Sequence, residues 1–231
     1  MPSEHTYKAF DLDIDTLRSS VTTMGGLVER QFVRAVDAVR FADLRRVMEV
    51  LTDEQTVNRM HIETDLRCNQ VIAKRQPIAV DLRETIAVIH TINDLERIGD
   101  EAKKIALKAQ HFNGRDLPTS IDKIQRMADL VAEMLGAAID AFVRHDTAVS
   151  GRLAETDREV DRRRDELVED LIARMSAEPA NVSDLLALVF VVQSIERVGD
   201  HAKNIAECTI YVVKGADVRH TPMEQIESVV R

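Results

Sequence analysis

The stretch DLERIGDEAKKIA at residues 94–106 recurs as SIERVGDHAKNIA at residues 194–206. Self-similarity at a fixed offset is the sequence signature of a structural unit that occurs more than once in a chain. The chain has 231 residues, which is enough for two units of about 100 residues each. We therefore expect two domains, at residues 1–115 and 116–231, that share one plan.

The composition favours helices over strands. The chain contains 8 Gly, 5 Pro, 2 Tyr, 6 Phe and no Trp. Sheet proteins need many turn residues and aromatic side chains, so this scarcity argues against a sandwich or a barrel. Hydrophobic residues make up 45% of the chain and charged residues 31%. That balance is typical of a folded globular protein rather than a disordered one.

Helical periodicity occupies most of the chain, and turn signals divide it. Asp43 is placed to cap the helix that follows it, while Pro77 and Pro179 interrupt the pattern at equivalent points of the two units. Six long helices are predicted, at residues 12–41, 44–74, 78–112, 120–144, 147–176 and 183–214. Because short connections make neighbouring helices antiparallel, the expected fold is all-α, with two tandem, homologous antiparallel three-helix bundles.

Residues 185–192 (LLALVFVV) are apolar on every side of the last predicted helix. A helix of this kind is buried on most sides. We therefore expect it to lie centrally, among the helices of its own bundle and against the other bundle. A strand of a parallel sheet is the alternative, but no other β-branched run accompanies this one.

Acidic residues four positions apart give the repeated stretch its chemistry. Glu96 and Asp100 form one such pair, and Glu196 and Asp200 form the other. This spacing places both side chains of a pair on one face of a helix. In each unit, steps of three or four residues lead back from the pair along an aliphatic stripe. The acids are therefore expected to continue a packing face.

Polar residues on the preceding helix repeat the spacing. Glu54 and Asn58 in the first unit correspond to Asp157 and Asp161 in the second, at an offset of 103 residues. If the two helices are antiparallel neighbours, three or four oxygen-bearing side chains gather in each bundle. Partly buried, unpaired carboxylates are costly, so either a cation lies beside them or their pKa values rise.

Two kinds of cation remain open at this point. Hard oxygen ligands suit a metal ion such as Mg, Ca, Mn or Fe. Local salt bridges are the other possibility, because Lys103 and Lys104 lie one turn after Asp100, and Lys203 lies one turn after Asp200. The sequence has no Glu-x-x-His pair, which counts against a di-iron protein of the ferritin type.

Several function classes are excluded by pattern or charge. The sequence has no glycine-rich phosphate loop, no Gly-x-Gly-x-x-Gly and no His-Glu-x-x-His. A net charge of −9 makes nucleic-acid binding unfavourable. Cys68 and Cys208 fit neither a metal site nor a disulfide framework, and we expect them to be buried. The N-terminal residues do not resemble a signal peptide, so a cytoplasmic location is expected.

The repeated block Glu-Arg-[Ile/Val]-Gly-Asp-x-Ala-Lys-x-Ile-Ala resembles the signature of the PhoU family, the phosphate-signalling regulators of bacteria and archaea. Residues 75–83 (RQPIAVDLR) are similar to the segment that precedes the first copy of this signature in the family. The resemblance extends over residues 8–214. It implies two similar three-helix bundles in a cytoplasmic, non-enzymatic protein that meets the membrane only through its partners.

The resemblance also implies partners and ligands. The partners are the ATPase subunit of the high-affinity phosphate importer and the phosphate-sensing histidine kinase, whose starvation signalling such proteins repress when phosphate is plentiful. Some members carry multinuclear metal clusters, which makes Fe, Zn, Mn, Mg or Ca the expected cofactor. Carried over by position, the metal ligands are Glu96, Asp100, Glu196, Asp200, Asp157, Asp161, Glu54 and Asn58. Because Asn58 supplies a neutral oxygen, the first site should be weaker or differently occupied.

A partner-binding role is expected only for the segment at residues 75–83, because the equivalent segment of the second unit does not keep its sequence. The residues concerned are Arg75, Gln76, Pro77, Asp81 and Arg83. A homodimer is also expected from the excess of apolar residues. The alternative function is a carboxylate-cluster metalloenzyme that hydrolyses a phosphate ester. The sequence places no obvious nucleophile or general base beside the acids, which disfavours this alternative.

Overall fold

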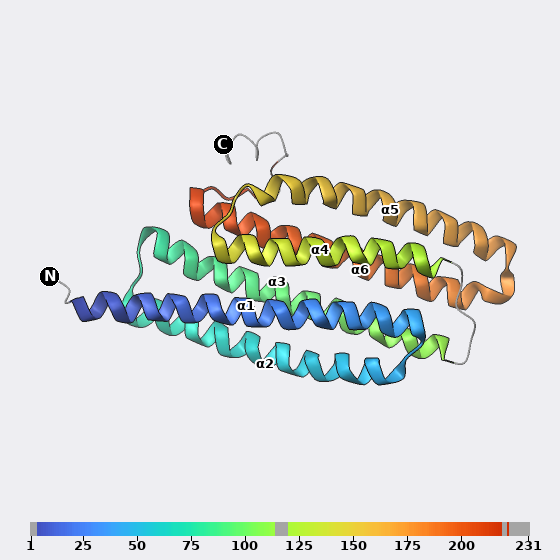
Figure 1. The fold of residues 1–231 in the computed structure, drawn as a ribbon, viewed down its shortest axis with the longest axis horizontal. Helices are drawn as coiled ribbons and strands as arrows, with labels where there is room; N and C mark the ends of the chain where they lie inside the picture. The colour runs from blue at the N-terminus through green and yellow to red at the C-terminus, as the bar shows by residue number, and fades with distance from the viewer. Residues whose placement is uncertain (1–3, 114–119, 219–220, 222–231) are drawn as a thin grey trace.

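The described part of the chain forms six long helices (Figure 1). The structure is a computed structural model that describes residues 4–113, 120–218 and 221. The helices are α1 (Glu4–Phe41), α2 (Leu44–Arg75), α3 (Ala79–Lys108), α4 (Ile121–Arg144), α5 (Val149–Ala177) and α6 (Val182–Lys214). Short 3₁₀ segments follow α3 at Ala109–Phe112 and precede α6 at Pro179–Asn181. No strand occurs in the described ranges, and the all-α prediction is confirmed.

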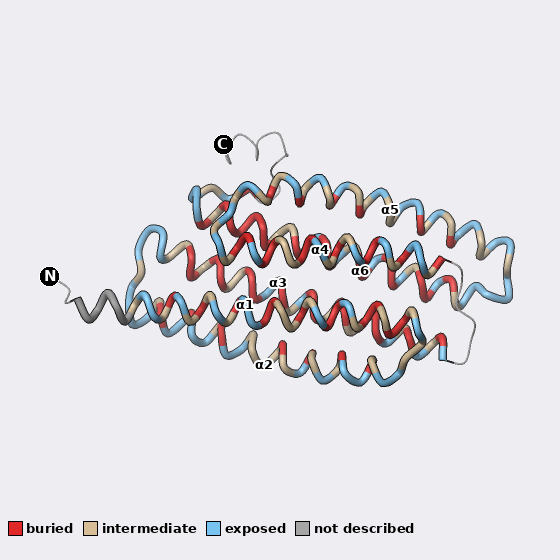
Figure 2. Tube along the Cα trace, in the orientation of Figure 1, coloured by how far each residue is buried: buried red, intermediate tan, exposed pale blue. Residues whose placement is uncertain are grey.

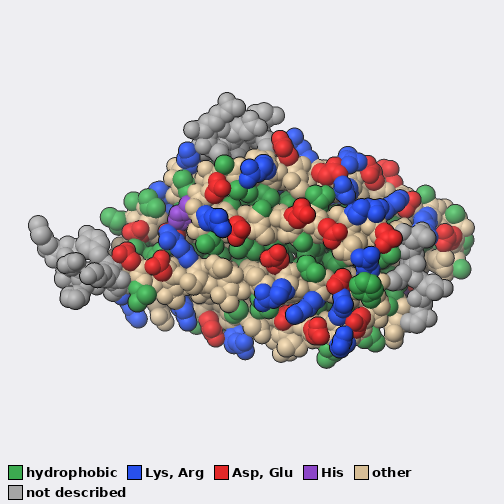
Figure 3. Space-filling model, in the orientation of Figure 1, with side chains coloured by type: hydrophobic (Ala, Val, Ile, Leu, Met, Phe, Trp, Pro, Cys, Tyr) green, Lys and Arg blue, Asp and Glu red, His purple; other side chains and the backbone are tan. Residues whose placement is uncertain are grey.

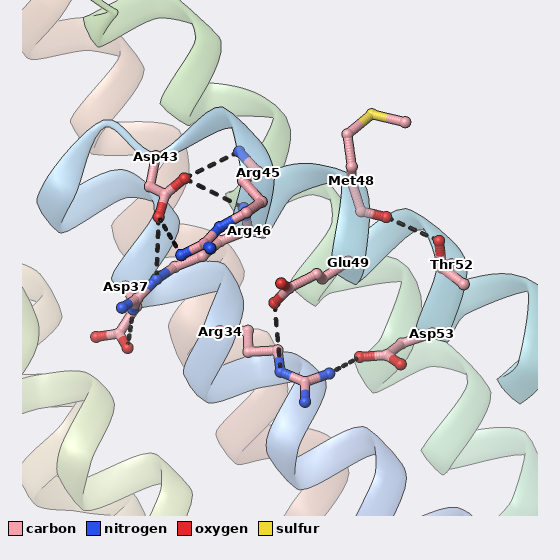
Figure 4. Close-up of polar contacts among 9 residues, drawn as sticks. All are labelled: Arg34, Asp37, Asp43, Arg45, Arg46, Met48, Glu49, Thr52 and Asp53. Carbon is pink, nitrogen blue, oxygen red and sulfur yellow. Dashed lines mark hydrogen bonds and ion pairs between the residues drawn. The ribbon is translucent and has the colours of Figure 1, made fainter.

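Side chains hold the turn between α1 and α2 (Figure 4). The Asp43 carboxylate accepts hydrogen bonds from the backbone N–H groups of Arg45 at 2.9 Å and Arg46 at 3.4 Å. These bonds satisfy two of the donors that the start of a helix leaves unpaired. The guanidinium of Arg46 reaches back to Asp37 on α1. The predicted cap at Asp43 is therefore confirmed, and the turn is also bound to the preceding helix.

The two bundles lie against each other along their length (Figure 1). Within the bundles, α1, α2 and α3 pack on one another, as do α4, α5 and α6. Between the bundles, α3 contacts α6 and α1 contacts α4, whereas α2 and α5 lie on opposite outer sides. The two predicted three-helix bundles are confirmed, and they are packed into one body.

One hydrophobic core runs through both bundles, and the inner helices carry most of it (Figure 2). The predicted central position of residues 185–192 is confirmed, because α6 packs on α3, α4 and α5. The run is not covered on every side, however. Leu186 is 44% exposed and Phe190 is 46% exposed. The ammonium nitrogen of Lys108 lies 4.7 Å from the centroid of the Phe190 ring and covers part of it.

The predicted domain boundary between residues 115 and 116 lies in the segment 114–119, outside the described residues. The predicted tail also lies largely outside them, since only residues 215–218 and 221 are described there. None of the described helices is both long and apolar enough to cross a membrane.

The surface in Figure 3 is mixed in charge, and the cysteines are buried as expected. On the face drawn in Figure 3, acidic and basic side chains are interspersed rather than gathered in separate regions. Cys68 and Cys208 are buried and reduced, as expected for small apolar core residues.

Candidate functional site

The first acid group (Glu54, Asn58, Glu96 and Asp100) lies between α2 and α3. Glu54 is only 3% exposed. Its Oε2 accepts a hydrogen bond from Nε2 of Gln31 on α1 at 3.0 Å, and its Oε1 accepts one from Nδ2 of Asn58 at 3.3 Å. Glycine at position 99 makes room for this arrangement. A Cβ atom there would lie 3.0 Å from Oε2 of Glu54 and 3.1 Å from Oε1 of Gln31.

A lysine supplies the charge nearest to these acids. Nζ of Lys103 lies 3.9 Å from Oε1 of Glu54 and 3.8 Å from Oδ1 of Asp100. Burial raises the pKa of Glu54, and the adjacent Asp100 carboxyl raises it further. The Gln31 amide and the Lys103 charge act in the opposite direction. Glu96, one turn before Asp100, makes no ion pair or hydrogen bond with the residues that the structure describes.

The second acid group (Asp157, Asp161, Glu196 and Asp200) lies between α5 and α6. Nζ of Lys203 lies 2.7 Å from Oδ2 of Asp157, whose side chain is 9% exposed. The other cation in this group is Arg164. Its guanidinium lies 2.7 Å from Oε1 of Glu196 and 3.7 Å from Oδ1 of Asp161. Lys203 and Arg164 each pair with an acid on the neighbouring helix, so both cations lie between α5 and α6.

Excess negative charge remains in the second acid group. Desolvation raises the pKa of Asp200, and the charge of Asp157 raises it further. Desolvation and then the Asp200 charge raise the pKa of Glu196, against the effect of Arg164. Four carboxylates share two cations here, so a further positive charge would relieve their repulsion.

The predicted acids do face each other across each helix pair, but they do not converge as metal ligands. Within residues 4–113, 120–218 and 221, no three His, Cys, Asp or Glu side chains gather closely enough to hold a metal ion. The predicted gathering of oxygen-bearing side chains between the helices of each bundle therefore stays a prediction as far as metal binding is concerned. Lysine and arginine side chains lie among the carboxylates instead.

The donor chemistry of both groups nevertheless fits a cation. In the first acid group, Oε1 of Gln31 and Oδ1 of Asn58 are buried and accept no hydrogen bond from the described residues. A buried acceptor without a donor costs about 1–3 kcal/mol, and a cation bound beside either oxygen would offset that cost. In the second acid group, every predicted ligand is a carboxylate, the donor that hard divalent cations prefer.

The segment predicted to meet a partner is partly presented to solvent and partly used within the fold. Gln76 ends α2 in the left-handed conformation, with φ of 50°, and it is exposed together with Asp81. Arg75 is bound to Asp13 on α1, with Nε 2.9 Å from Oδ2. Arg83 donates from Nε to the backbone carbonyl of Val212 on α6 at 3.4 Å. Arg83 therefore links the two bundles.

Sequence reasoning missed three residues of these sites. Gln31 lies outside both copies of the motif, and only its place one helix away from Glu54 brings it into the group. Arg164 lies three residues after Asp161, the same spacing that indicated Lys103 and Lys203, and this signal could have found it. Ile78, beside Pro77, is 78% exposed, which no periodicity predicts.

Comparison with known proteins places the chain in one family. The family model described as PhoU domain matches residues 21–109 and 124–209, one match in each bundle. The chain is 36% identical over 230 residues to the phosphate-specific transport system accessory protein PhoU homolog of Pseudomonas putida, covering 99% of this chain and 90% of that protein. It is 34% identical over 226 residues to the accessory protein PhoU of Escherichia coli strain K12, covering 97% and 93%.

Solved structures agree in fold. The crystal structure of PhoU from Pseudomonas aeruginosa superposes with a TM-score of 0.86 and 36% sequence identity, covering 90% of this chain and 100% of that one. The crystal structure of the phosphate transport system regulatory protein PhoU from Streptococcus pneumoniae superposes with a TM-score of 0.83 over 90% of this chain and 98% of that one. Its sequence identity is 24%, so this second likeness bears on the fold alone.

Proposed function

Because this chain belongs to the PhoU family, we propose that it is a non-enzymatic, cytoplasmic regulator of phosphate uptake and phosphate signalling. It acts on the high-affinity phosphate importer through the importer's ATPase subunit. It also represses signalling by the phosphate-sensing histidine kinase when phosphate is plentiful. The observation that carries this proposal is the match to named phosphate-transport accessory proteins over nearly the whole chain, both copies of the acid motif included.

The turn between α2 and α3 is the proposed docking point for a protein partner. Ile78 and Val80 are 78% and 48% exposed there, beside the exposed Gln76 and Asp81. Ala79 has a φ of 49° and Gln76 a φ of 50°. Non-glycine residues rarely adopt this left-handed region, and such strain tends to gather at functional sites. The turn thus holds two aliphatic side chains in water on a strained backbone, as a binding surface would require.

A divalent or trivalent metal ion is the proposed ligand of the acid groups. Glu54, Asn58, Glu96 and Asp100 would hold it in the first bundle, and Asp157, Asp161, Glu196 and Asp200 in the second. When bound, such an ion supplies positive charge between two helices, which the raised pKa values of Glu54, Glu196 and Asp200 indicate is in short supply. Metal here is a structural or regulatory ligand that fixes the helix pairs.

A homodimer is proposed through the outer face of α2. Met48, Ile62 and Leu66 are 64%, 61% and 55% exposed on this helix. Large apolar side chains gathered on one exposed helix are typical of an interface with another chain. The second copy of this chain is the proposed occupant, since the opposite outer helix, α5, exposes a single large apolar side chain, Ile172, within the described ranges.

A reporter of the phosphate-starvation response tests the function. Deletion of the gene should switch the reporter on in phosphate-rich medium, and the wild-type protein should switch it off again. The variant Ile78→Ser with Val80→Ser should fold normally but fail to restore repression and fail to capture the ATPase subunit or the kinase. The control Ile172→Ser changes an aliphatic residue on α5 that is 54% exposed, and it should behave as wild type. Unchanged reporter activity after deletion would contradict the proposal.

A further inference from the structure

The contact between α3 and α6 contains a polar pair that the acid motifs do not account for. Asp94 on α3 is 8% exposed. Its Oδ1 lies 2.9 Å from Nδ1 of His201 and 3.3 Å from Nδ2 of Asn204, both on α6. Asp94 therefore orients His201 and joins the two bundles.

The duplicated sequence has a different pair at the equivalent place. At the offset of 100 residues, Asp94 corresponds to Ser194 and His201 corresponds to Glu101. Glu101 is 5% exposed, and its Oε1 lies 3.5 Å from Nη1 of Arg197 across the helix contact. Glu101 of the first bundle therefore forms an ion pair with Arg197 of the second bundle.

Arg97 is the counterpart of Arg197, and it lacks such an acid. The position equivalent to Glu101 holds His201, which cannot neutralise an arginine. Arg97 is exposed and makes no ion pair within the residues that the structure describes. The two halves of the α3–α6 contact therefore differ, and in one of them the guanidinium of Arg97 makes no ion pair with the described residues.

A cavity of about 810 Å³ opens on this half of the contact, between the two bundles. Its basic and amide lining consists of Arg97, Arg197, His90, His201, Lys203, Asn93 and Asn204. The cavity is large enough for a small organic anion or for a phosphoryl group with a substituent. Donors from α3 and from α6 both reach it, so any ligand there would touch both bundles.

Acidic residues also line the cavity: Asp94 has donors of its own, whereas Asp200 and Glu207 share Lys203 with Asp157. Asp94 is bound by His201 and Asn204. Asp200 and Glu207 lie near Lys203, whose positive charge is favoured by its hydrogen bond to Asp157 and by these two carboxylates. Arg97 makes no ion pair with the residues that the structure describes. Arg197 directs Nη1 toward Glu101 and keeps its other nitrogens available. The guanidinium groups are therefore the donors left for an anion.

We propose that this cavity binds a phosphoryl oxyanion, held by the guanidinium groups of Arg97 and Arg197. Planar guanidinium groups match the oxygens of such an anion in pairs, with charge-assisted hydrogen bonds. The choice of phosphate among oxyanions rests on the proposed function, whereas the site itself rests on the geometry. Because the donors come from both bundles, the bound anion stabilises their contact and links phosphate level to the shape of the whole protein.

Calorimetric titration of the purified full-length protein tests this site. The protein is first stripped of metal on a chelating resin, and orthophosphate and adenosine monophosphate are titrated separately at constant ionic strength. Arg97→Gln should weaken binding at least about tenfold, the factor expected for one lost charge-assisted hydrogen bond. Arg126→Gln removes an exposed arginine on α4, away from the cavity, and should leave binding unchanged.

A second variant keeps the test decisive if Arg97→Gln disturbs folding. Asp94→Ser combined with His201→Glu reproduces the arrangement that the other half of the contact already tolerates at Ser194 and Glu101. It should fold, pair its new acid with Arg97 and lose the anion.

Binding of orthophosphate alone would identify the free ion, and binding of the monophosphate alone would identify an ester; either supports the site. Equal affinity in wild type and both variants would overturn it. The proposal would also be overturned if acetate displaced the bound phosphate as well as orthophosphate does. Failure of both orthophosphate and adenosine monophosphate to bind at about 10 mM would overturn it too. The outcome is independent of partner docking, because the protein is tested by itself.

Discussion

Replacing Gly99 and Gly199 separately by alanine should change stability by different amounts, although the two residues are equivalent in the repeat. Alanine is favoured over glycine in a helix by about 1 kcal/mol, and this gain is common to both sites. At position 199 the new Cβ would lie 3.7 Å from Val131 and 3.8 Å from Val160, which is ordinary contact. Gly199→Ala should therefore stabilise the protein by about 1 kcal/mol.

At position 99 the new Cβ would lie 3.0 Å from Oε2 of Glu54, 3.1 Å from Oε1 of Gln31 and 3.4 Å from Cγ1 of Val57. Glu54 and Gln31 are both buried, so they cannot swing into solvent. Overpacking of this kind costs about 1–3 kcal/mol. After the helix gain is subtracted, Gly99→Ala should be neutral or destabilising by up to about 2 kcal/mol.

Urea unfolding followed by far-UV circular dichroism measures both variants beside the wild type. Because helix propensity cancels between the two substitutions, the difference in unfolding free energy isolates the steric cost, about 1–3 kcal/mol. The comparison requires equal slopes against urea concentration for the two variants. A Gly99→Ala protein as stable as the Gly199→Ala protein would refute the packing of Glu54 and Gln31 against α3.

Three further predictions concern a cap, a buried ion pair and pH. Asp43→Ala should lower the free energy of unfolding by about 1 kcal/mol, because α2 loses its cap; an unchanged thermal midpoint would contradict this. Lys203→Met should destabilise the protein by about 1–3 kcal/mol, since Asp157 stays buried without its 2.7 Å partner. Adding Asp157→Asn to that variant should restore part of the loss, and a double variant no more stable than the single one would argue against the pair. Desolvation and neighbouring carboxylates raise the pKa of Asp200 above its ordinary value of 3.8, so the folded protein holds this proton to higher pH than the unfolded chain. The stability that this proton provides is present below pH 3.8 and is lost as pH rises through the raised pKa. Asp200→Asn should therefore stabilise the protein at neutral pH, and this effect should disappear in acid. Midpoints of urea unfolding, measured across the pH range, check this prediction.

Features that depend on local chemistry could be predicted from the sequence. The capping aspartate Asp43 and the breaks at Pro77 and Pro179 act within a few residues, and the helices end within a few residues of the predicted positions. The first helix is the exception, since it begins at Glu4 rather than at residue 12. The duplication fixed the equivalence of the two bundles, because one pattern repeats at two places in the chain.

Features that depend on side chains from different helices could not be predicted. The neighbours of Glu54 include Gln31 on α1, and those of Glu196 include Arg164 on α5. Spacing along α5 points to Arg164 as a neighbour of Asp161, but it does not reveal the contact with Glu196 on α6, and no spacing points to Gln31. Phe190 stays half exposed inside an apolar run because, within the described part of the chain, the long helices that pack on α6 are α3, α4 and α5, and they leave this side open. The pairing of Asp94 with His201 could not be predicted either, because the two residues are 107 positions apart and lie on different helices.

A crystal structure of protein purified without chelator, recorded with anomalous scattering, would show whether a metal ion lies between the helices. The inward-facing carboxylates of α2, α3, α5 and α6 carry more negative charge than we expect nearby lysine and arginine to balance. We therefore predict an anomalous peak between α5 and α6 beside Asp157 and Asp200, with Lys203 displaced from its present contact. Carboxylates still paired with Lys203 and Arg164, with no metal between the helices, would contradict it.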